Sequence, residues 1–334
     1  MSADSTLADV IGRQTNRNMF SWLLGRQVFW VTLATLLACV LLSLISDKFA
    51  TPGNIFNVTR NFAFVGIIAV GMTAVIISGG IDLSVGGTLL IAAMVTAYVM
   101  SRGMPFWQAL PLALLASMLV GAVNGLLIAV FHMQPFVITL GMMSIARSLG
   151  MVISDNKLTY EFGPDGPLLL GFGGGQSFGI PNPVFVLVIL AVVTALALRW
   201  TKWGRHLYAI GGNEKAAVLT GVPVKTVKVS VYVFAGFCAG LAGVLQTGWL
   251  GSAATNLGTG MELTVIAAAV IGGANLAGGM GTALGAVVGA ALIEVIRNSL
   301  ILLGISTFWQ GTFVGCFIIL AVAFDRLRNQ DTGE

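Results

Sequence analysis

The chain has 334 residues, of which 57% are hydrophobic and 9% charged, and its mean hydropathy is +0.93. A water-soluble domain of this length needs far more polar surface, so the composition excludes that class and predicts an all-α polytopic membrane protein. The formal net charge of +4 is explained by the distribution of charge between loops, and we expect no nucleic acid partner.

Apolar windows of roughly 18 to 25 residues predict about ten transmembrane helices in one domain, 28–325. The first apolar run is expected to remain as an anchor, because no small-residue cleavage pattern follows it. Residues 1–27 and 326–334 are then a cytoplasmic N-terminal segment and a cytoplasmic tail. The predicted spans are 28–46, 62–80, 84–100, 107–131, 135–153, 183–200, 229–250, 263–280, 282–302 and 309–325.

Orientation follows from the basic residues of the loops, which are enriched on the cytoplasmic side of membrane proteins. With both termini cytoplasmic, the cytoplasmic side holds eleven basic residues and the opposite side holds Lys48, Arg60, Arg102 and Lys157. The eleven are Arg13, Arg17, Arg26, Arg199, Lys202, Arg205, Lys215, Lys225, Lys228, Arg326 and Arg328.

Two loops are long enough to carry structure of their own: 154–182 on the outside and 201–228 in the cytoplasm. In the second, Asn213 is a good N-cap residue, and Glu214 suits the positive end of a short helix. Gly221 and Pro223 are expected to end that helix. Physical reasoning alone leaves two interpretations: an interfacial helix that ties two spans together, or a docking element for a soluble partner.

Small residues recur at four-residue spacing within several spans, which places them on one helix face. We expect these glycines to let helices pack closely within one chain, in preference to a dimer contact. The pairs and runs are Gly121 with Gly125, Gly236 with Gly240, and Gly281, Gly285 and Gly289.

Charges at membrane depth are costly, so each is a functional candidate. Asp82 and Ser84 follow Gly79 and Gly80 near the start of a helix, and we expect them to cap its free amides, in preference to a proton relay by Asp82. The stretch from Gly79 shares four of eight positions with GGANLAGG at 272–279, which is either a chance match or an internal repeat of the kind found in transporters.

The other charges in the spans suggest structural roles. Glu294 and Arg297 are three residues apart on one helix and are expected to pair. Arg147 is expected to bind a carboxylate or backbone carbonyls, and Glu262 lies at the outer end of its span.

The sequence contains no complete enzyme motif. The GQSFG stretch at 175–179 matches a hydrolase elbow but lacks the strand, acid and histidine that the chemistry needs. His132 and His206 form no metal motif, and the three cysteines are too far apart to bind one. No lysine follows a glycine, so a P-loop is absent, and we expect neither ATPase activity nor a bound cofactor or metal.

Three stretches together resemble the permease subunits of bacterial ABC importers for ribose, xylose, arabinose, galactose and related sugars. They are SGGIDLSVGG, GRHLYAIGGNEKAAVLTG and ELTVIAAAVIGGANLAGGMG, and the likeness extends from about Asn54 to Asp325. The resemblance implies a multi-pass protein of the bacterial inner membrane that imports a monosaccharide by alternating access. ATP and Mg²⁺ would bind a separate cytoplasmic ATPase, and a periplasmic sugar-binding protein would deliver the solute to a homodimer or a pair of paralogous permeases.

The resemblance also assigns roles to residues. The segment from Gly204 to Gly221 would contain the coupling helix that docks in the ATPase. Its implied residues are Gly204, Arg205, Tyr208, Gly211, Gly212, Asn213, Glu214, Ala216, Ala217 and Gly221. A neutral sugar needs hydrogen-bonding groups, and the pathway candidates are Ser84, Asn124, Thr139, Glu262 and Asn275.

The chain departs from the family pattern at Val218, where a basic residue is usual, and at Thr264 and Ala274–Asn275. The departures at Thr264 and Ala274–Asn275 leave the identity of the transported solute undetermined, and nucleosides or branched-chain amino acids are alternatives to a sugar. A rival of another class is an ion-driven secondary transporter in which Asp82 or Glu262 binds the ion. A membrane-embedded enzyme is a remote alternative.

Overall fold

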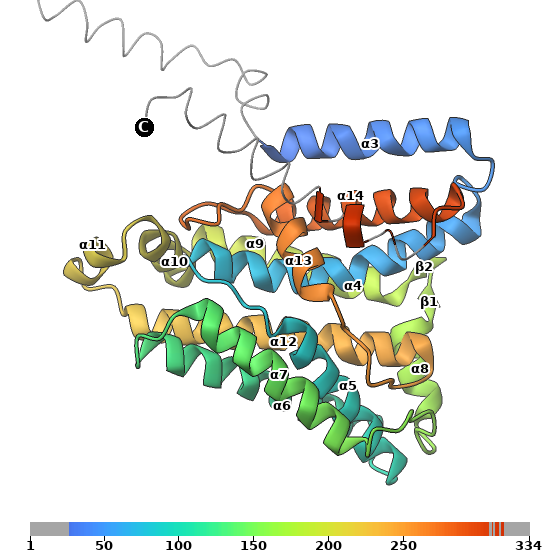
Figure 1. The fold of residues 1–334 in the computed structure, drawn as a ribbon, viewed down its shortest axis with the longest axis horizontal. Helices are drawn as coiled ribbons and strands as arrows, with labels where there is room; N and C mark the ends of the chain where they lie inside the picture. The colour runs from blue at the N-terminus through green and yellow to red at the C-terminus, as the bar shows by residue number, and fades with distance from the viewer. Residues whose placement is uncertain (1–26, 307–308, 310, 314, 317–334) are drawn as a thin grey trace, which may run out of the picture.

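The computed structural model describes residues 27–306, 309, 311–313 and 315–316, and these are overwhelmingly helical (Figure 1). Seven of the described helices are long and apolar enough to cross a membrane. They are α3 (Gln27–Ile45), α4 (Pro52–Ile77), α6 (Phe106–Ala129), α7 (Pro135–Ile153), α9 (Asn182–Trp200), α12 (Val224–Leu250) and α14 (Ala283–Leu302). Two apolar helices are shorter, α5 (Val85–Ser101) and α13 (Met261–Ile271).

The all-α membrane class is therefore confirmed, while several predicted boundaries are wrong. Helix α4 begins at Pro52, ten residues before the predicted 62, because Thr51 caps it and Pro52 suits its first position. Arg60 consequently lies inside a helix. Helix α13 ends at Ile271 instead of 280, because Gly273 has a φ of +98°, which a continuing helix cannot accommodate. The predicted span 309–325 lies largely outside the described residues.

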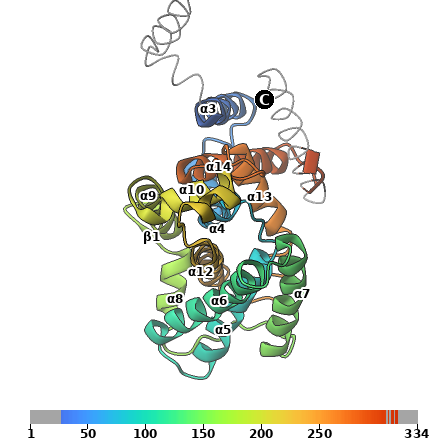
Figure 2. The same ribbon diagram turned by 90° about the vertical axis from the view of Figure 1, so that its left-hand side faces the viewer.

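Helix α12 is the centre of the bundle. Figure 2 shows it between a group that contains α4, α13 and α14 and a group that contains α5, α6 and α7. It packs directly against α4, α5, α6 and α8 (Gly166–Gly174). The outermost helix, α3, instead exposes apolar side chains such as Leu36, Leu37 and Leu44, as expected of a surface that faces lipid.

Glycines allow the closest helix contacts. A Cβ atom at Gly121 of α6 would overlap the backbone oxygen of Tyr232 on α12, and one at Gly236 would overlap the backbone oxygen of Ser117 on α6. On α14, a Cβ at Gly289 would overlap the backbone oxygen of Ala268 on α13. The expected packing role within the chain is confirmed for these residues. Gly281 differs because it lies in the loop before α14.

The two ends of the bundle carry different structures. One end, called the α11 end, carries α10 (Lys202–Gly212) and α11 (Glu214–Leu219). The opposite α8 end carries α8 and a small hairpin of β1 (Gln176–Ser177) and β2 (Ile180–Pro181). Thr159 pairs with Ala253 in an antiparallel bridge, which joins loop 154–182 to the segment after α12.

We predict that Gly121→Ala lowers the stability of the protein by about 1–3 kcal/mol, because the added methyl group forces α6 away from α12. Thermal unfolding of the detergent-purified protein measures the effect. The matched control is Gly141→Ala on α7, where no atom lies within 4 Å of the new Cβ position. Equal melting temperatures for the two variants would contradict a packing role for Gly121.

Candidate functional site

Helix α11 has the predicted local structure. The Asn213 Oδ1 accepts a hydrogen bond from the N–H of Ala216 at 3.0 Å, which caps the helix. Glu214 lies in the first turn, where the helix dipole favours a negative charge. Gly221 has a φ of +81°, and this left-handed residue together with Pro223 separates α11 from α12. The predicted cap and the predicted stop are both confirmed.

Helix α11 projects from the bundle, as Figure 1 shows, and is held by few contacts. Ala217 is buried, and Glu214 forms an ion pair with Lys228 of α12 at 2.7 Å. The outward face includes Val218 and Leu219, whose exposed fractions are 57% and 88%. An anchored helix that presents apolar and charged side chains outward is suited to bind another protein.

Helix α10 packs tightly on its neighbours. A Cβ at Gly204 would overlap the backbone of Leu198 at the end of α9. Arg205 is exposed, and its guanidinium donates to the backbone oxygen of Trp200 at 3.4 Å. The Tyr208 hydroxyl donates to the backbone oxygen of Gly281 at 2.7 Å. Burial raises the pKa of Tyr208, which keeps its hydroxyl protonated as a donor.

Glycines from two loops meet a glycine near the end of α10, and the four residues Gly79, Gly211, Gly278 and Gly279 are called the glycine junction here. The N–H of Gly279 donates to the backbone oxygen of Ile77 at 2.9 Å. A Cβ at Gly211 would overlap that same oxygen, and one at Gly278 would lie 3.2 Å from the Cα of Gly79. The ends of α4 and α10 and the loop after α13 are therefore in direct backbone contact.

The two similar stretches form the same turn. The Asp82 Oδ1 accepts from the N–H of Ser84 at 2.9 Å, and the Asn275 Oδ1 accepts from the N–H of Ala277 at 2.9 Å. Each side-chain oxygen therefore takes the place of a backbone carbonyl as the acceptor for the N–H group two residues further on. Asp82 also accepts from the Ser84 hydroxyl at 2.6 Å. Ser84 occupies the N-cap position of α5 but makes no side-chain cap, so capping by the Ser84 hydroxyl is contradicted.

The uncharged pathway candidates near this turn are buried and hydrogen-bonded within the protein. The amide of Asn124 donates to the Ser84 hydroxyl at 2.8 Å, and both side chains are completely buried. Thr139 is also completely buried and donates to the backbone oxygen of Pro135 at 2.9 Å. Asp82, Ser84 and Asn124 thus form one connected network between α5 and α6, which positions the start of α5.

Arg147 and Glu262 both lie beside Gly86, since a Cβ there would be 3.2 Å from the Arg147 Nη2 and 2.6 Å from the Glu262 Oε2. Arg147 donates to the backbone oxygen of Gly258 at 3.0 Å and to the Thr259 hydroxyl at 3.0 Å. The expected binding of Arg147 to backbone carbonyls is confirmed. Glu262 is half-buried, and its Oε2 has no hydrogen-bond partner. Arg147 therefore holds the loop that leads into α13, and Glu262 stands beside that loop.

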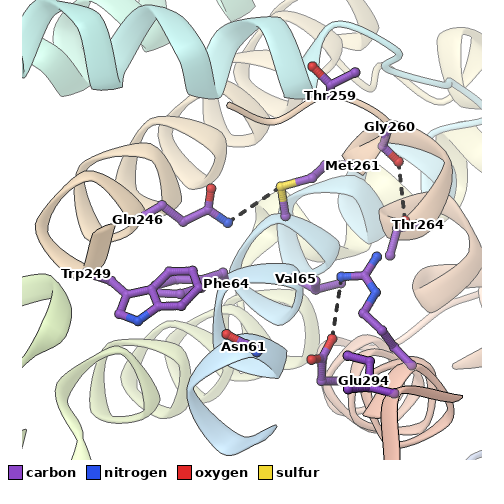
Figure 3. Close-up of a pocket in the computed structure, with 12 residues that line it drawn as sticks. Asn61, Phe64, Val65, Gln246, Trp249, Thr259, Gly260, Met261, Thr264 and Glu294 are labelled. Atoms are coloured by element: carbon purple, nitrogen blue, oxygen red, sulfur yellow. Dashed lines mark hydrogen bonds and ion pairs between the residues drawn. The ribbon is translucent and has the colours of Figure 1, made fainter. Parts of the chain in front are cut away.

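A cavity of about 270 Å³ lies between α4, α12, α13 and α14 (Figure 3). Phe64, Gln246 and Glu294 form its buried part, whereas Gly260 and Ile301 are exposed at its rim. The expected pair of Glu294 and Arg297 is confirmed, with an N···O distance of 3.6 Å. None of the pathway candidates Asn124, Thr139, Glu262 and Asn275 is among the residues that line it.

Asn61 and Gln246, which line the cavity, were not identified from the sequence. Asn61 lies just before the predicted span 62–80, and Gln246 is an uncharged residue of the span 229–250. An amide inside an apolar helix is the signal that would have found them, since a buried amide requires hydrogen-bond partners. Trp249 packs against Phe64, with 5.6 Å between ring centroids, and the Arg60 guanidinium lies 4.6 Å from the centre of its ring.

Comparison with known proteins identifies the family. The model of the "branched-chain amino acid transport system / permease component" family matches residues 54–322. The chain belongs to this permease family. It is 39% identical over 290 residues to the ribose import permease of Bacillus subtilis, covering 87% of this chain and 90% of that one.

Other relatives have similar names. The ribose import permease of Escherichia coli K12 is 37% identical over 310 residues, covering 92% of this permease and 96% of that protein. The D-allose transport system permease of the same organism is 38% identical over 289 residues, covering 86% and 88%. No solved structure matches the chain.

At the Asp82 turn, we predict that Asp82→Asn retains more transport activity than Asp82→Leu. Asparagine keeps an oxygen that accepts from Ser84, whereas leucine leaves buried donors unpaired at a cost of about 1–3 kcal/mol. Solute uptake and thermal stability of both variants measure the difference. Equal and complete loss of uptake by two stable variants would instead indicate that the charge itself is essential.

At the glycine junction, we predict that Gly211→Ala abolishes most transport, because the methyl group cannot fit beside Ile77 and Gly279. Gly212→Ala is the matched control, since nothing lies within 4 Å of a Cβ at that neighbouring position. Uptake by membrane vesicles that contain equal amounts of each variant provides the measurement. If both variants transport at the normal rate, the junction has no role in transport.

Proposed function

We propose that the chain is the membrane-spanning permease subunit of an ATP-binding-cassette importer and carries a monosaccharide into the cytoplasm. The observation that carries the proposal is the exposed, capped helix α11, present in a chain whose named relatives include ribose, allose and arabinose permeases. A transporter driven by an ion gradient has no use for such a docking helix. The names of these relatives favour a sugar over a nucleoside or a branched-chain amino acid.

The proposed orientation places the α11 end in the cytoplasm and the α8 end outside the bacterial inner membrane. Lys202, Arg205, Lys215 and Lys228 lie at or near the α11 end, as the positive-inside rule favours. Both termini would then be cytoplasmic, with the span 309–325 as the tenth helix. The α8 end would receive the sugar from a periplasmic binding protein.

The proposed assembly contains two permease copies, or this permease with a paralogue, around a two-fold axis. Each copy would dock α11 in a cytoplasmic ATPase subunit, which binds ATP and Mg²⁺. Glu214 and Ala216 would form the docking contact, while the buried Ala217 would anchor the helix and Asn213 and Gly221 would set its boundaries. Approach of the two ATPases would move α11, and the backbone contacts at the glycine junction would transmit that movement to α4 and α13.

We predict that Glu214→Lys separates the permease from its ATPase while the permease remains folded in the membrane. The substitution reverses a charge on the docking face and replaces the ion pair to Lys228 with repulsion. A proline at Ala217 is expected to have the same effect, because it breaks α11. Affinity purification of the tagged permease, coexpressed with its own ATPase, measures the retained ATPase.

Lys215→Glu reverses an exposed charge on the same helix and serves as a control for charge reversal alone. ATPase activity stimulated by the sugar-loaded binding protein supplies a second measurement in the reconstituted complex. Normal stimulation in the Glu214→Lys variant would contradict docking through α11. Sugar uptake by the permease without any ATPase, driven by an ion gradient, would contradict the importer proposal as a whole.

A further inference from the structure

The cavity between α4, α12, α13 and α14 contains a buried carboxylate that the helix bundle does not fully satisfy. The side chain of Glu294 is 4% exposed, and its Oε2 has no hydrogen-bond partner. Arg297 lies 3.6 Å from that oxygen, which compensates the charge but is too long for a hydrogen bond. Asn61 donates a hydrogen bond to the Glu294 carboxylate, so one carboxylate oxygen is left without a donor. A buried acceptor of this kind is costly inside a membrane, and a ligand hydroxyl can supply the missing donor.

Besides the Glu294–Arg297 pair, the cavity is lined by neutral polar side chains and by apolar ones, and one wall is aromatic. Asn61 lies beside Glu294, and Gln246 approaches from α12 (Figure 3). The Gln246 amide nitrogen donates to the sulfur of Met261 at 3.6 Å. Because a thioether sulfur is a weak acceptor, most of the hydrogen-bonding capacity of the Gln246 amide stays free. The rings of Phe64 and Trp249 cover the adjacent wall.

The start of α13 adds further donors. Gly260 and Met261 line the cavity where this helix begins, and no side chain caps its first turn. The N–H groups of a helix N-terminus without a cap have no helical partner. The N–H of Met261 already donates to the backbone oxygen of Gly258 at 3.3 Å, so only the N–H groups that follow it in this turn can supplement the carboxylate and the amides.

We propose that this cavity is a transit site for a single monosaccharide, in which Glu294 accepts hydrogen bonds from sugar hydroxyls and Gln246 and Asn61 bind neighbouring hydroxyls. The proposal rests on the proposed sugar import and assigns a location to it. The apolar face of a sugar ring would lie against Trp249, while a volume of about 270 Å³ suits one small solute. The two opposite charges already compensate each other, which favours a neutral polyol over an amino acid zwitterion.

The position along the membrane supports a transit site. Glu294 lies eight residues before Leu302, the last residue of α14, which places it about 12 Å along the helix from its outer end. That depth is near the middle of a hydrocarbon layer of about 30 Å. A sugar that enters from the α8 end would therefore reach this carboxylate about halfway through its passage.

The direct test is protection of a cysteine introduced into the cavity. Gln246→Cys permease, assembled with its ATPase and binding protein in proteoliposomes, is labelled with a small neutral maleimide. D-ribose, D-allose and L-arabinose are compared with sucrose, which is too large for the cavity. We expect at least one monosaccharide to slow labelling several-fold and sucrose to have no effect. Thr264→Cys repeats the test on α13 if the first variant does not assemble.

The functional test is the substitution Glu294→Gln, with Glu161→Gln as the matched control. Glu161 is exposed in the outer loop and does not line the cavity. We expect Glu294→Gln to slow sugar uptake about tenfold, as the loss of one charged hydrogen bond does, and Glu161→Gln to leave it unchanged. The decrease in uptake caused by Glu294→Gln is expected to be smaller for a deoxy sugar that lacks the contacted hydroxyl. A general folding defect would instead reduce the uptake of both sugars equally.

The outcomes separate the two proposals. If the unmodified assembly imports no monosaccharide, the proposed function fails and the transit site fails with it. If it imports sugar but neither cysteine is protected and Glu294→Gln transports normally, only the transit site is overturned. Protection by leucine in place of the sugars would assign the cavity to an amino acid and would also overturn it.

Discussion

The bundle depends on direct contact between helix backbones. Lipid chains are as apolar as leucine, so burial of apolar surface gives little drive to bring membrane helices together, and close packing must supply the attraction. Glycine provides this at Gly121 and Gly236 between α6 and α12, and at Gly289 between α14 and α13. The central position of α12 follows, because a helix with glycines on several sides can be approached by several neighbours at once.

The buried polar groups of the bundle also have to find hydrogen-bond partners within the protein. Asp82, Ser84 and Asn124 hydrogen-bond to one another beside the start of α5, although the Asn124 Oδ1 has no partner. Glu294 pairs with Arg297 but keeps an Oε2 without a hydrogen bond, and it faces a cavity together with Gln246. An unpartnered polar atom therefore does not by itself indicate a solute site, and Glu294 differs from Asn124 in lining an open space.

Local signals in the sequence predicted local structure well. Asn213 and Gly221 defined α11, and the spacing of Glu294 and Arg297 predicted their pair, because each depends on residues within one or two helical turns. Hydropathy could not locate the start of α4, since Thr51 and Pro52 set that boundary outside the apolar window. It also could not show that α13 ends early, because apolar residues continue past the positive-φ glycine that stops it.

The candidate site was harder to predict because it joins distant parts of the chain. The cavity combines residues from Asn61 to Ile301, and no spacing within one helix indicates that they meet. Polarity was also a poor guide to exposure, since Asn124 and Thr139 are polar but completely buried. Sequence reasoning identified which residues are unusual in a membrane, and the three-dimensional arrangement decided which of them face an open space.

Helix α4 connects two regions of very different chemistry. Asn61 and Phe64 contribute to the cavity, while the backbone oxygen of Ile77 belongs to the contact with Gly279 some sixteen residues further along the same helix. At about 1.5 Å per residue, that separation is roughly 24 Å of rigid rod. The contact between Ile77 and Gly279 is made by backbone atoms alone, so it is independent of the side chains that line the cavity. Under the proposed import mechanism, such a division lets evolution exchange the cavity residues, and with them the transported molecule, while the mechanical linkage to the energy source stays the same.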